Sequence, residues 1–148
     1  MRIAIGADHA GVLLKQHLVD GILRGHDVTD VGANSTEPVD YPDIARAVVK
    51  RIRRGEAERG ILICGTGIGM AMAAGKFPGI RAATCTDSFS AEMSRRHNDA
   101  NVLCLGARVL GTGLAEHIVG AWLEALFEGG RHATRVGKLE DRTSGEIR

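Results

Sequence analysis

The sequence predicts an α/β fold in which a five-stranded parallel sheet is covered by helices on both faces. Short apolar runs of strand length recur five times, and they alternate with segments of helical periodicity. Such alternation is typical of a parallel sheet with helices on both sides. The 20 glycines suit the tight turns that such a fold needs. We therefore expect a Rossmann-like three-layer α/β/α sandwich, with strands over residues 2–7, 27–31, 61–63, 81–86 and 102–106.

Helical periodicity fills the segments between the strands, where apolar residues recur on one side of an amphipathic helix. Gly25 ends the first helix, and Pro42 stands near the start of the second, a position that proline favours. Phe77-Pro78-Gly79 ends the third helix, and Asp87 or Ser88 can cap the fourth. The expected helices cover residues 11–24, 43–54, 70–74, 87 or 88 to about 96, and 112–127.

The connecting segments are polar or rich in glycine. Residues 34–42 are expected to form a polar loop, and residues 97–101 a polar turn before the last strand. Residues 128–132 close the last helix, and the charged tail from Lys138 is expected to be loose. With 148 residues and 44% hydrophobic content, the chain is expected to be a single domain over residues 1–148.

Composition argues against several kinds of partner. The 19 basic and 18 acidic residues give no basic field for nucleic acid or a membrane surface, and aromatic residues are only 3%. No apolar stretch approaches membrane-spanning length, and the N-terminus has no signal-peptide pattern. Cys64, Cys85 and Cys104 are odd in number and follow the spacing of strands rather than of a disulfide framework. We expect a cytoplasmic protein.

The segment from Gly60 to Lys76 carries the most specific chemical signal. An apolar strand stops at Cys64, and Gly65, Gly67 and Gly69 lead directly into a helix of small residues. The first amides of a helix have no partner within it, and a helix N-terminus favours anions. A thiolate beside such amides indicates proton-transfer or nucleophilic chemistry, although an isolated cysteine is more often a buried structural residue.

Two nucleotide-binding motifs fit this segment poorly. A P-loop would need glycine in place of Met70, and Gly75-Lys76 lies at the far end of the helix. Gly65 and Gly67 match the first two glycines of the dinucleotide-binding motif, but Met70 stands in place of the third. Asp87 stands where the ribose-binding acid of that motif would lie. Nicotinamide binding stays open as a minor alternative.

Several other residues are candidates for a site at the carboxyl ends of the strands, where ligands of such sheets bind. Asp8 and His9 follow the first strand, and Thr66 stands beside the thiol. Tyr41 in the polar loop and Arg108 after the last strand could each touch a ligand. Helix capping or loop anchoring would explain the same residues without any function.

Four candidates lie elsewhere. Arg131 and Arg135 are spaced i, i+4 and would form one anion-binding cup if that stretch is helical, although a solvated surface pair is commoner. His97 and Asn98 precede the last strand, so within one chain they should face away from Cys64. That conflict suggests a site shared between subunits. No expected element carries a metal-ligand set, so we expect neither metal nor cofactor.

Five stretches occur in order over essentially the whole chain. They are G-A-D-H-A-G at 6–11, D-Y-P-D at 40–43, G-I-L-I-C-G-T-G-I-G at 60–69, S-R-R-H-N-D-A-N-V-L at 94–103 and G-G-R-H-A-T-R-V at 129–136. Together they resemble the type B ribose-5-phosphate isomerases, a family that includes the galactose-6-phosphate isomerase subunits. One departure is Gly75, where the family usually has asparagine.

The resemblance implies an aldose–ketose isomerase that works on a phosphorylated sugar through a cis-enediolate. By position, Cys64 would move the proton between C1 and C2, Thr66 would help to shift the proton between the two oxygens, and His97 would assist ring opening. The amides from Gly65 to Gly69 would hold the enediolate charge. Other substrate contacts would come from Asp8 and Asn98 on hydroxyls, and from His9, Arg131, Arg135 and also Arg108 on the phosphate.

The resemblance also implies a homodimer or a dimer of dimers with active sites built across two subunits. D-ribose 5-phosphate, a substrate of the pentose phosphate pathway, is the first expectation. Allose 6-phosphate, galactose 6-phosphate and erythrulose 4-phosphate are alternatives within the same chemistry. A non-catalytic phosphosugar-binding protein is the alternative of another class, although binding alone would not need Cys64, Thr66 and His97 together.

Overall fold

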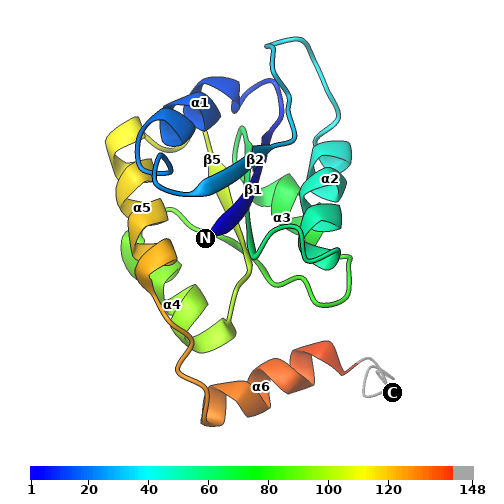
Figure 1. Cartoon of the computed structure of the whole chain (residues 1–148), viewed down its shortest axis with the longest axis vertical. Coiled ribbons are helices and arrows are strands. Elements are labelled where there is room, and N and C mark those ends of the chain that lie inside the picture. The colour runs from blue at the N-terminus through cyan, green and yellow to red at the C-terminus, as the bar shows by residue number, and fades with distance from the viewer. Residues whose placement is uncertain (142–148) are drawn as a thin grey trace.

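The computed structural model describes residues 1–141, and within them five strands form one parallel sheet (Figure 1). The order in the sheet is β2-β1-β3-β5-β4, so β3 is the central strand and is buried along its length. The expected α/β fold with its five-stranded parallel sheet is confirmed. The strands are β1 (Arg2–Ala7), β2 (Asp27–Asp30), β3 (Arg59–Cys64), β4 (Ala82–Thr84) and β5 (Val102–Gly106).

Helices cover both faces of the sheet and complete the three layers. α1, α4 and α5 pack on one face, and α2 and α3 pack on the other, whereas α6 stands below the body next to α4 (Figure 1). No helix of the described part is long and apolar enough to cross a membrane. The helices are α1 (Val12–Asp20), α2 (Tyr41–Arg53), α3 (Ile68–Ala74), α4 (Ser88–Asn98), α5 (Thr112–Glu124) and α6 (Arg131–Glu140).

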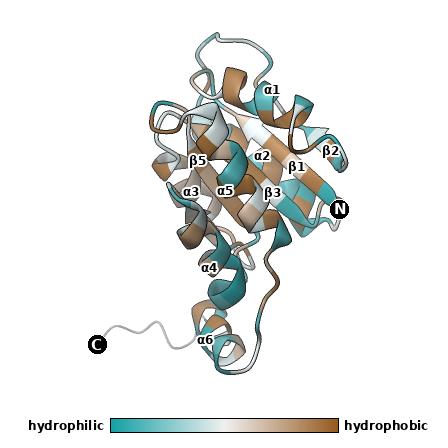
Figure 2. Cartoon of the chain, turned by 90° about the vertical axis from the view of Figure 1, so that its left-hand side faces the viewer, coloured by the Kyte–Doolittle hydropathy of each residue, from teal (hydrophilic) through white to brown (hydrophobic). Residues whose placement is uncertain are grey.

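Alternation of side chains along the strands divides the core into two clusters. In β3, Ile61 and Ile63 pack with Trp122 of α5, whereas Leu62 faces the other way and packs with Met70 of α3. All five side chains are fully buried, and each such burial contributes about 1.5–3 kcal/mol before entropy is counted. Figure 2 shows the same arrangement, with hydrophobic strands enclosed between the helices.

The strand order creates a natural place for a ligand. From β1 the chain crosses to β2 at one edge, and it then returns past β1 to β3. The direction of the connections therefore reverses between β1 and β3. In open parallel sheets, ligands bind beyond the carboxyl ends of the strands at such a reversal.

Some element boundaries differ from the expectation. α1 stops at Asp20 because residues 21–25 form successive turns, and α5 stops at Glu124. α2 begins earlier than expected, at Tyr41, with Pro42 in its first turn. β4 has three residues instead of the expected six, because pairing with β5 is confined to Ala82–Thr84.

The C-terminal region departs furthest from the sequence-based expectation. The expected polar turn at 97–101 is partly wrong, because α4 continues through Asn98 and ends at Asp99, whose φ is +48°. The expected loose tail from Lys138 is also wrong at its start, since α6 continues through Glu140. The rest of that tail, residues 142–148, lies outside the described part of the chain.

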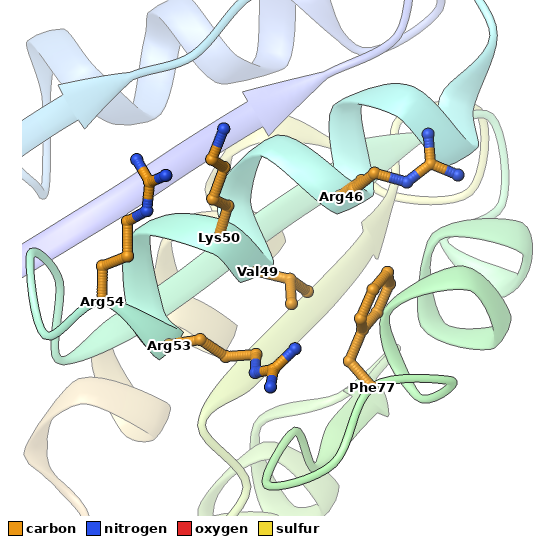
Figure 3. Close-up of a pocket in the computed structure, with 6 residues that line it drawn as sticks. All are labelled: Arg46, Val49, Lys50, Arg53, Arg54 and Phe77. Atoms are coloured by element: carbon orange, nitrogen blue, oxygen red, sulfur yellow. The ribbon is translucent and has the colours of Figure 1, made fainter.

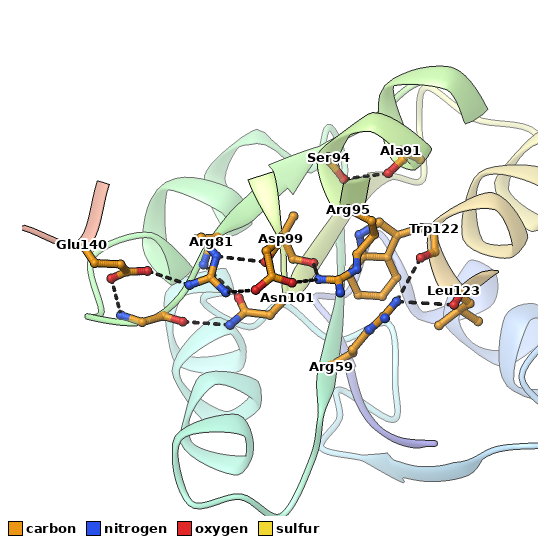
Figure 4. A network of polar contacts seen from close by, with 12 residues as sticks. Arg59, Arg81, Ala91, Ser94, Arg95, Asp99, Asn101, Trp122, Leu123 and Glu140 are labelled. Atoms are coloured by element: carbon orange, nitrogen blue, oxygen red, sulfur yellow. Dashed lines mark hydrogen bonds and ion pairs between the residues drawn. The ribbon is translucent and has the colours of Figure 1, made fainter. Parts of the chain in front are cut away.

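A polar network explains why α6 extends so far (Figure 4). Arg81 lies between two carboxylates, with Nη1 2.7 Å from Glu140 Oε1 and Nη2 2.8 Å from Asp99 Oδ2. The amide of Gly79 also donates to Glu140 Oε2 at 3.0 Å. The end of α6 is thus tied to the segment before β4 and to the end of α4. These partners are remote in sequence, so local composition could not predict them.

Candidate active site

The sheet register brings the ends of β1, β3 and β5 to one edge. Ala7 pairs with Ile63, and Cys64 pairs with Gly106. Asp8 follows Ala7, and its amide donates to the Ile63 carbonyl oxygen at 3.0 Å. The residues after β1 and β3 therefore lie side by side, as the predicted site requires.

The turn after β3 holds the Cys64 side chain against a backbone donor. The amide of Gly67 donates to Cys64 Sγ at 3.1 Å, and the cysteine is 6% exposed. Gly67 has a φ of +80°, and a Cβ there would lie 3.0 Å from the backbone carbon of Leu105 on β5. Glycine is needed for both reasons. The donor lies where it can stabilise negative charge at the sulfur.

Tyr41 and Arg108 flank this turn. A Cβ on Gly69 would lie 2.9 Å from ring carbons of Tyr41, so the ring packs over that glycine. A Cβ on Gly65 would lie 3.3 Å from Nη1 of Arg108, whose own amide donates to the Gly65 carbonyl oxygen at 3.0 Å. Both residues are exposed, so they can meet a ligand above the turn. Ile68, at the start of α3, donates its amide to the Thr66 hydroxyl at 3.3 Å.

The β1 side of the site is held by local hydrogen bonds. Asp8 is 7% exposed, and its Oδ1 accepts from the amide of Ala10 at 2.9 Å. His9 accepts from the amide of Val39 through Nδ1 at 3.3 Å. Because Nδ1 is an acceptor, the imidazole carries its proton on Nε2 when neutral. His9 therefore presents a donor on its other ring nitrogen.

A buried lysine fixes the loop that borders His9. The Nζ atom of Lys15 donates to Asp30 Oδ1 and to the Ala33 carbonyl oxygen, each at 2.7 Å, and to Asn34 Oδ1 at 3.3 Å. The lysine is 1% exposed, so these three acceptors replace its hydration. Lys15 joins α1 to the start of the segment that leads to Val39 and Tyr41.

The other predicted site residues lie at the opposite end of β5. His97 and Asn98 end α4, which leads to Val102 at the start of β5, whereas Cys64 pairs with Gly106 at its end. The strand between them spans about 13 Å. Arg131 and Arg135 lie on α6, so their stretch is helical, and α6 packs against α4. One chain therefore holds two separate groups of predicted residues.

The second group contains two residues that sequence reasoning missed. The imidazoles of His97 and His132 stack with centroids 4.3 Å apart and an interplanar angle of 4°. Glu128 Oε2 lies 3.9 Å from Nε2 of His97 and 3.5 Å from Nε2 of His132. His132 stands inside the motif shared with the family, and that motif was the usable signal for it in the sequence.

Charges around this group act in opposite directions. Hydrogen bonds from Arg96 lower the pKa of Glu128, and the guanidinium atoms Nε and Nη2 lie 2.6 and 2.5 Å from its Oε1. Burial lowers the pKa of His132, and the neighbouring His97 and Arg131 lower it further. His132 is therefore held as a neutral imidazole next to a carboxylate.

The remaining cysteines belong to the core. Cys85 is 2% exposed and Cys104 is fully buried. Burial raises the pKa of Cys85 to about 11 and raises that of Cys104 as well. A thiol that stays protonated is a poor base or nucleophile at neutral pH. Cys64 is the cysteine that stands at a strand end beside a glycine-rich turn.

A basic groove of about 400 Å³ lies beside α2, apart from both groups (Figure 3). It contains none of the predicted site residues and no nucleophile or acid. Phe77 and Val49 form its apolar floor, and Arg46 pairs at 2.9 Å with Asp43 on the same helix. We assign it no part in the chemistry. Its lining residues are Arg46, Val49, Lys50, Arg53, Arg54 and Phe77.

Comparisons with known proteins agree with this fold and arrangement. The family model described as Ribose/Galactose Isomerase matches residues 3–139. Ribose-5-phosphate isomerase B of Escherichia coli is 52% identical over 136 residues, which are 91% of each chain. A D-erythrulose-4-phosphate isomerase of Pectobacterium atrosepticum is 49% identical over 142 residues, which are 94% of this chain and 93% of that one.

Solved structures show the same similarity. Ribose-5-phosphate isomerase B of Clostridium thermocellum superposes with a TM-score of 0.94 at 54% identity, covering 97% of this chain and 98% of that one. The chain therefore belongs to the ribose/galactose isomerase family. Within that family it is a sugar-phosphate isomerase like the type B ribose-5-phosphate isomerases, and thus an enzyme of the aldose–ketose isomerase type.

Proposed function

We propose that this enzyme interconverts D-ribose 5-phosphate and D-ribulose 5-phosphate without a metal or cofactor. The observation that carries the proposal is the Cys64 sulfur, held 3.1 Å from the Gly67 amide at the carboxyl end of the central strand. A proton-transfer base needs such a place, next to donors that can stabilise the charge formed in the reaction. The 52% identity to the ribose-5-phosphate isomerase B of Escherichia coli supports this choice of sugar.

The proposed reaction uses one sulfur twice. The Cys64 thiolate removes the proton from C2 of the open-chain aldose, and that electron pair forms the C1–C2 double bond while the carbonyl electrons move to O1. A proton then passes from O2 to O1 with help from Thr66. The Cys64 thiol returns its proton to C1 as the O2 carbonyl forms. The amides from Gly65 to Gly69 stabilise the enediolate, at roughly 10²–10³-fold in rate per donor.

The ring-opening and phosphate-binding residues come from a second copy of the chain in this proposal. His97 would act as the acid and base for ring opening, with Asn98 on a hydroxyl and Arg131 and Arg135 on the phosphate. Within one chain these residues lie at the far end of β5 from Cys64. A homodimer, or a dimer of dimers, that joins the two groups would complete each site. Asp8, His9, Tyr41 and Arg108 would complete the Cys64 side.

The second candidate substrate is D-erythrulose 4-phosphate. The D-erythrulose-4-phosphate isomerase of Pectobacterium atrosepticum is 49% identical to this chain, nearly as similar as the ribose-5-phosphate isomerase B of Escherichia coli. The proton transfer would be the same, and only the length of the sugar would differ. The three free cysteines also keep the cytoplasm as the expected location, since thiols stay reduced there.

Substrate identity is tested by comparing kcat/KM on four sugars. Purified protein in EDTA is assayed with ribose 5-phosphate, allose 6-phosphate, galactose 6-phosphate and erythrulose 4-phosphate. We expect the highest kcat/KM for ribose 5-phosphate. A higher value for another sugar would keep the chemistry and reassign the pathway. No turnover of any of them would support a phosphosugar-binding protein instead.

The role of the thiol is tested with Cys64→Ala. Loss of the base should reduce kcat by at least about 10²-fold while the phosphosugar still binds, as measured by calorimetry. Cys85→Ala is the matched control, because it removes a buried thiol that packs in the core cluster on the other face of the sheet from Cys64, and its kcat should be retained. Parallel loss of binding and turnover in Cys64→Ala would instead give Cys64 a structural role.

A further inference from the structure

The group formed by His97, Glu128 and His132 has a property that the proposed reaction does not use. Its ligand atoms, two imidazole nitrogens and one carboxylate oxygen, lie within 4.8 Å of one another. They come from the end of α4, the segment before α6 and the first turn of α6. We propose that these three residues bind a divalent transition-metal ion of the zinc type, and that the bound ion inhibits the enzyme.

The distances within the group approach those of such a site. In tetrahedral zinc sites the metal–ligand distances of 2.0–2.2 Å place the ligand atoms about 3.3 Å apart. Glu128 Oε2 already lies 3.5 Å from Nε2 of His132 and 3.9 Å from Nε2 of His97. Both imidazoles thus present the same nitrogen to the same oxygen. The two rings are parallel, so their nitrogen lone pairs do not converge as they stand. The side chain of His97 is 38% exposed, so its ring has room to turn off the stack and direct Nε2 at an ion held by Glu128 and His132.

Hydrogen bonds from neighbouring residues hold the carboxylate ligand in place. Arg96 binds the Oε1 atom of Glu128 through Nε and Nη2 and leaves Oε2 facing the imidazoles. Ligating carboxylates are commonly fixed by such outer hydrogen bonds. His132 is 6% exposed, so burial restricts the movement of its ring.

The ligand set determines which ions bind. Two imidazoles and one carboxylate suit zinc, copper and nickel, whereas magnesium and calcium prefer oxygen ligands. The nearby guanidinium groups of Arg96, Arg131 and Arg135 oppose cations in general. Only ions that form strong bonds to imidazole nitrogen can therefore overcome this repulsion.

Inhibition follows from the residue that the ion would occupy, and this part rests on the proposed function. His97 must exchange a proton through its ring to open the sugar. Metal bound at Nε2 blocks that nitrogen and holds the imidazole beside Glu128. Chelation of the ion would restore turnover, which gives a practical reason to assay the enzyme in EDTA.

Metal binding is tested first without any activity readout. The full-length protein is stripped with EDTA, dialysed and titrated with zinc chloride in a calorimeter, and magnesium chloride serves as the comparison ion. We expect one zinc per chain and no measurable heat of magnesium binding. Glu128→Gln and His132→Ala should each weaken zinc binding by about tenfold or more. Circular dichroism checks the fold, and Glu128→Gln is the milder change.

Two further variants separate this site from other zinc ligands. His117→Asn removes an exposed imidazole on α5 and should leave the affinity unchanged. Cys64→Ser removes the other strong candidate ligand and should also leave it unchanged. Zinc binding that is equal in the wild type, Glu128→Gln and His132→Ala, or binding that disappears in Cys64→Ser, would overturn the proposal.

Enzyme turnover provides the second test of the proposal. Zinc should inhibit turnover over the same concentration range in which it binds, and excess EDTA should reverse the effect. Binding without inhibition would uphold the metal site and refute the role of His97 in turnover. Inhibition without binding at this group would refute the site and leave the proposed isomerase reaction intact.

Discussion

Gly67 illustrates how single residues position the chemistry of this enzyme. Its φ of +80° aims its amide at Cys64 Sγ, and its missing side chain lets the turn approach β5. The turn also approaches β5 closely at Gly106, where a Cβ would lie 2.8 Å from the backbone of Thr66. The glycines after β3 therefore serve packing and chemistry together.

We predict that Gly67→Ala destabilises the protein more than Gly79→Ala does. Both positions have positive φ, +80° and +76°, which costs an alanine about 1–2 kcal/mol. A Cβ at Gly67 also meets the backbone of β5 at 3.0 Å, whereas nothing lies within 4 Å of one at Gly79. Crowding against a rigid strand should add about 1–3 kcal/mol. Urea unfolding measures both, and equal costs would contradict the close approach.

Among the elements, α4 begins as the sequence predicts. Asp87 accepts from the amide of Ser90 at 2.7 Å and so caps the helix. That backbone hydrogen bond lowers the pKa of Asp87 below its ordinary value of 3.8. The carboxylate is the form that the fold favours. Its contribution to stability is therefore present above pH 3.8 and is lost as the pH falls through the lower folded value.

We accordingly expect Asp87→Ala to lower the urea midpoint at pH 7, and the difference from the wild type to shrink below pH 3.8. Asp20→Ala is the control, because it removes a carboxylate from the last turn of α1, where a negative charge is unfavourable. It should not lower the midpoint at pH 7. A loss in Asp87→Ala that stays constant down to acidic pH would argue against a charge-dependent cap.

α6 depends on its partners more than on its own sequence. It is exposed along most of its length, and His132 is its one buried residue. The Arg81–Glu140 ion pair, with side chains 19% and 36% exposed, fastens its last turn. An ion pair this exposed contributes only about 0.2–1 kcal/mol to global stability. Its effect should therefore be local.

We predict that Glu140→Ala increases amide hydrogen exchange in α6 and leaves the urea midpoint nearly unchanged. Asp43→Asn removes a more exposed ion pair on α2 and is the control for the loss of one surface carboxylate, so exchange in α6 should stay as in the wild type. Because Arg131 and Arg135 lie on α6, KM for the phosphosugar should rise in Glu140→Ala. Unchanged exchange in α6 would mean that other contacts hold the helix.

At the scale of the whole molecule, the two groups of site residues divide along β5. Cys64, Thr66 and the glycines belong to the carboxyl end, whereas His97 and the α6 arginines belong to the other end. A shared site predicts complementation between two inactive variants. Each variant alone, Cys64→Ala or His97→Asn, inactivates both active sites of a homodimer. A mixed dimer has one site in which both residues are intact.

Random mixing of these variants by co-refolding should therefore restore about one quarter of wild-type activity, since half of the dimers are mixed and each has one intact site. Activity is measured before and after mixing, and sedimentation gives the oligomeric state. Each variant refolded alone is the control and should stay inactive. A mixture that remains inactive, or an active monomer, would place the complete site within one chain.

The layers, the parallel sheet and the chemistry of the turn after β3 could be predicted from the amino-acid sequence. Apolar runs and helical periodicity are local signals, and the glycines next to Cys64 are adjacent in sequence. The residues around Cys64 could be predicted because parallel strands bring their carboxyl ends to one edge. The resemblance to the family then suggested a role for each of these residues.

The C-terminal region and the second group of residues depend on contacts between distant parts of the chain. α6 forms where its end meets Arg81 and Gly79, and these residues lie about 60 positions earlier in the chain. His97, Glu128 and His132 meet because α6 docks on α4. Neither event has a local signal in composition or periodicity. Long-range contacts stabilise both, so the sequence supplied the residues and the packing brought them together.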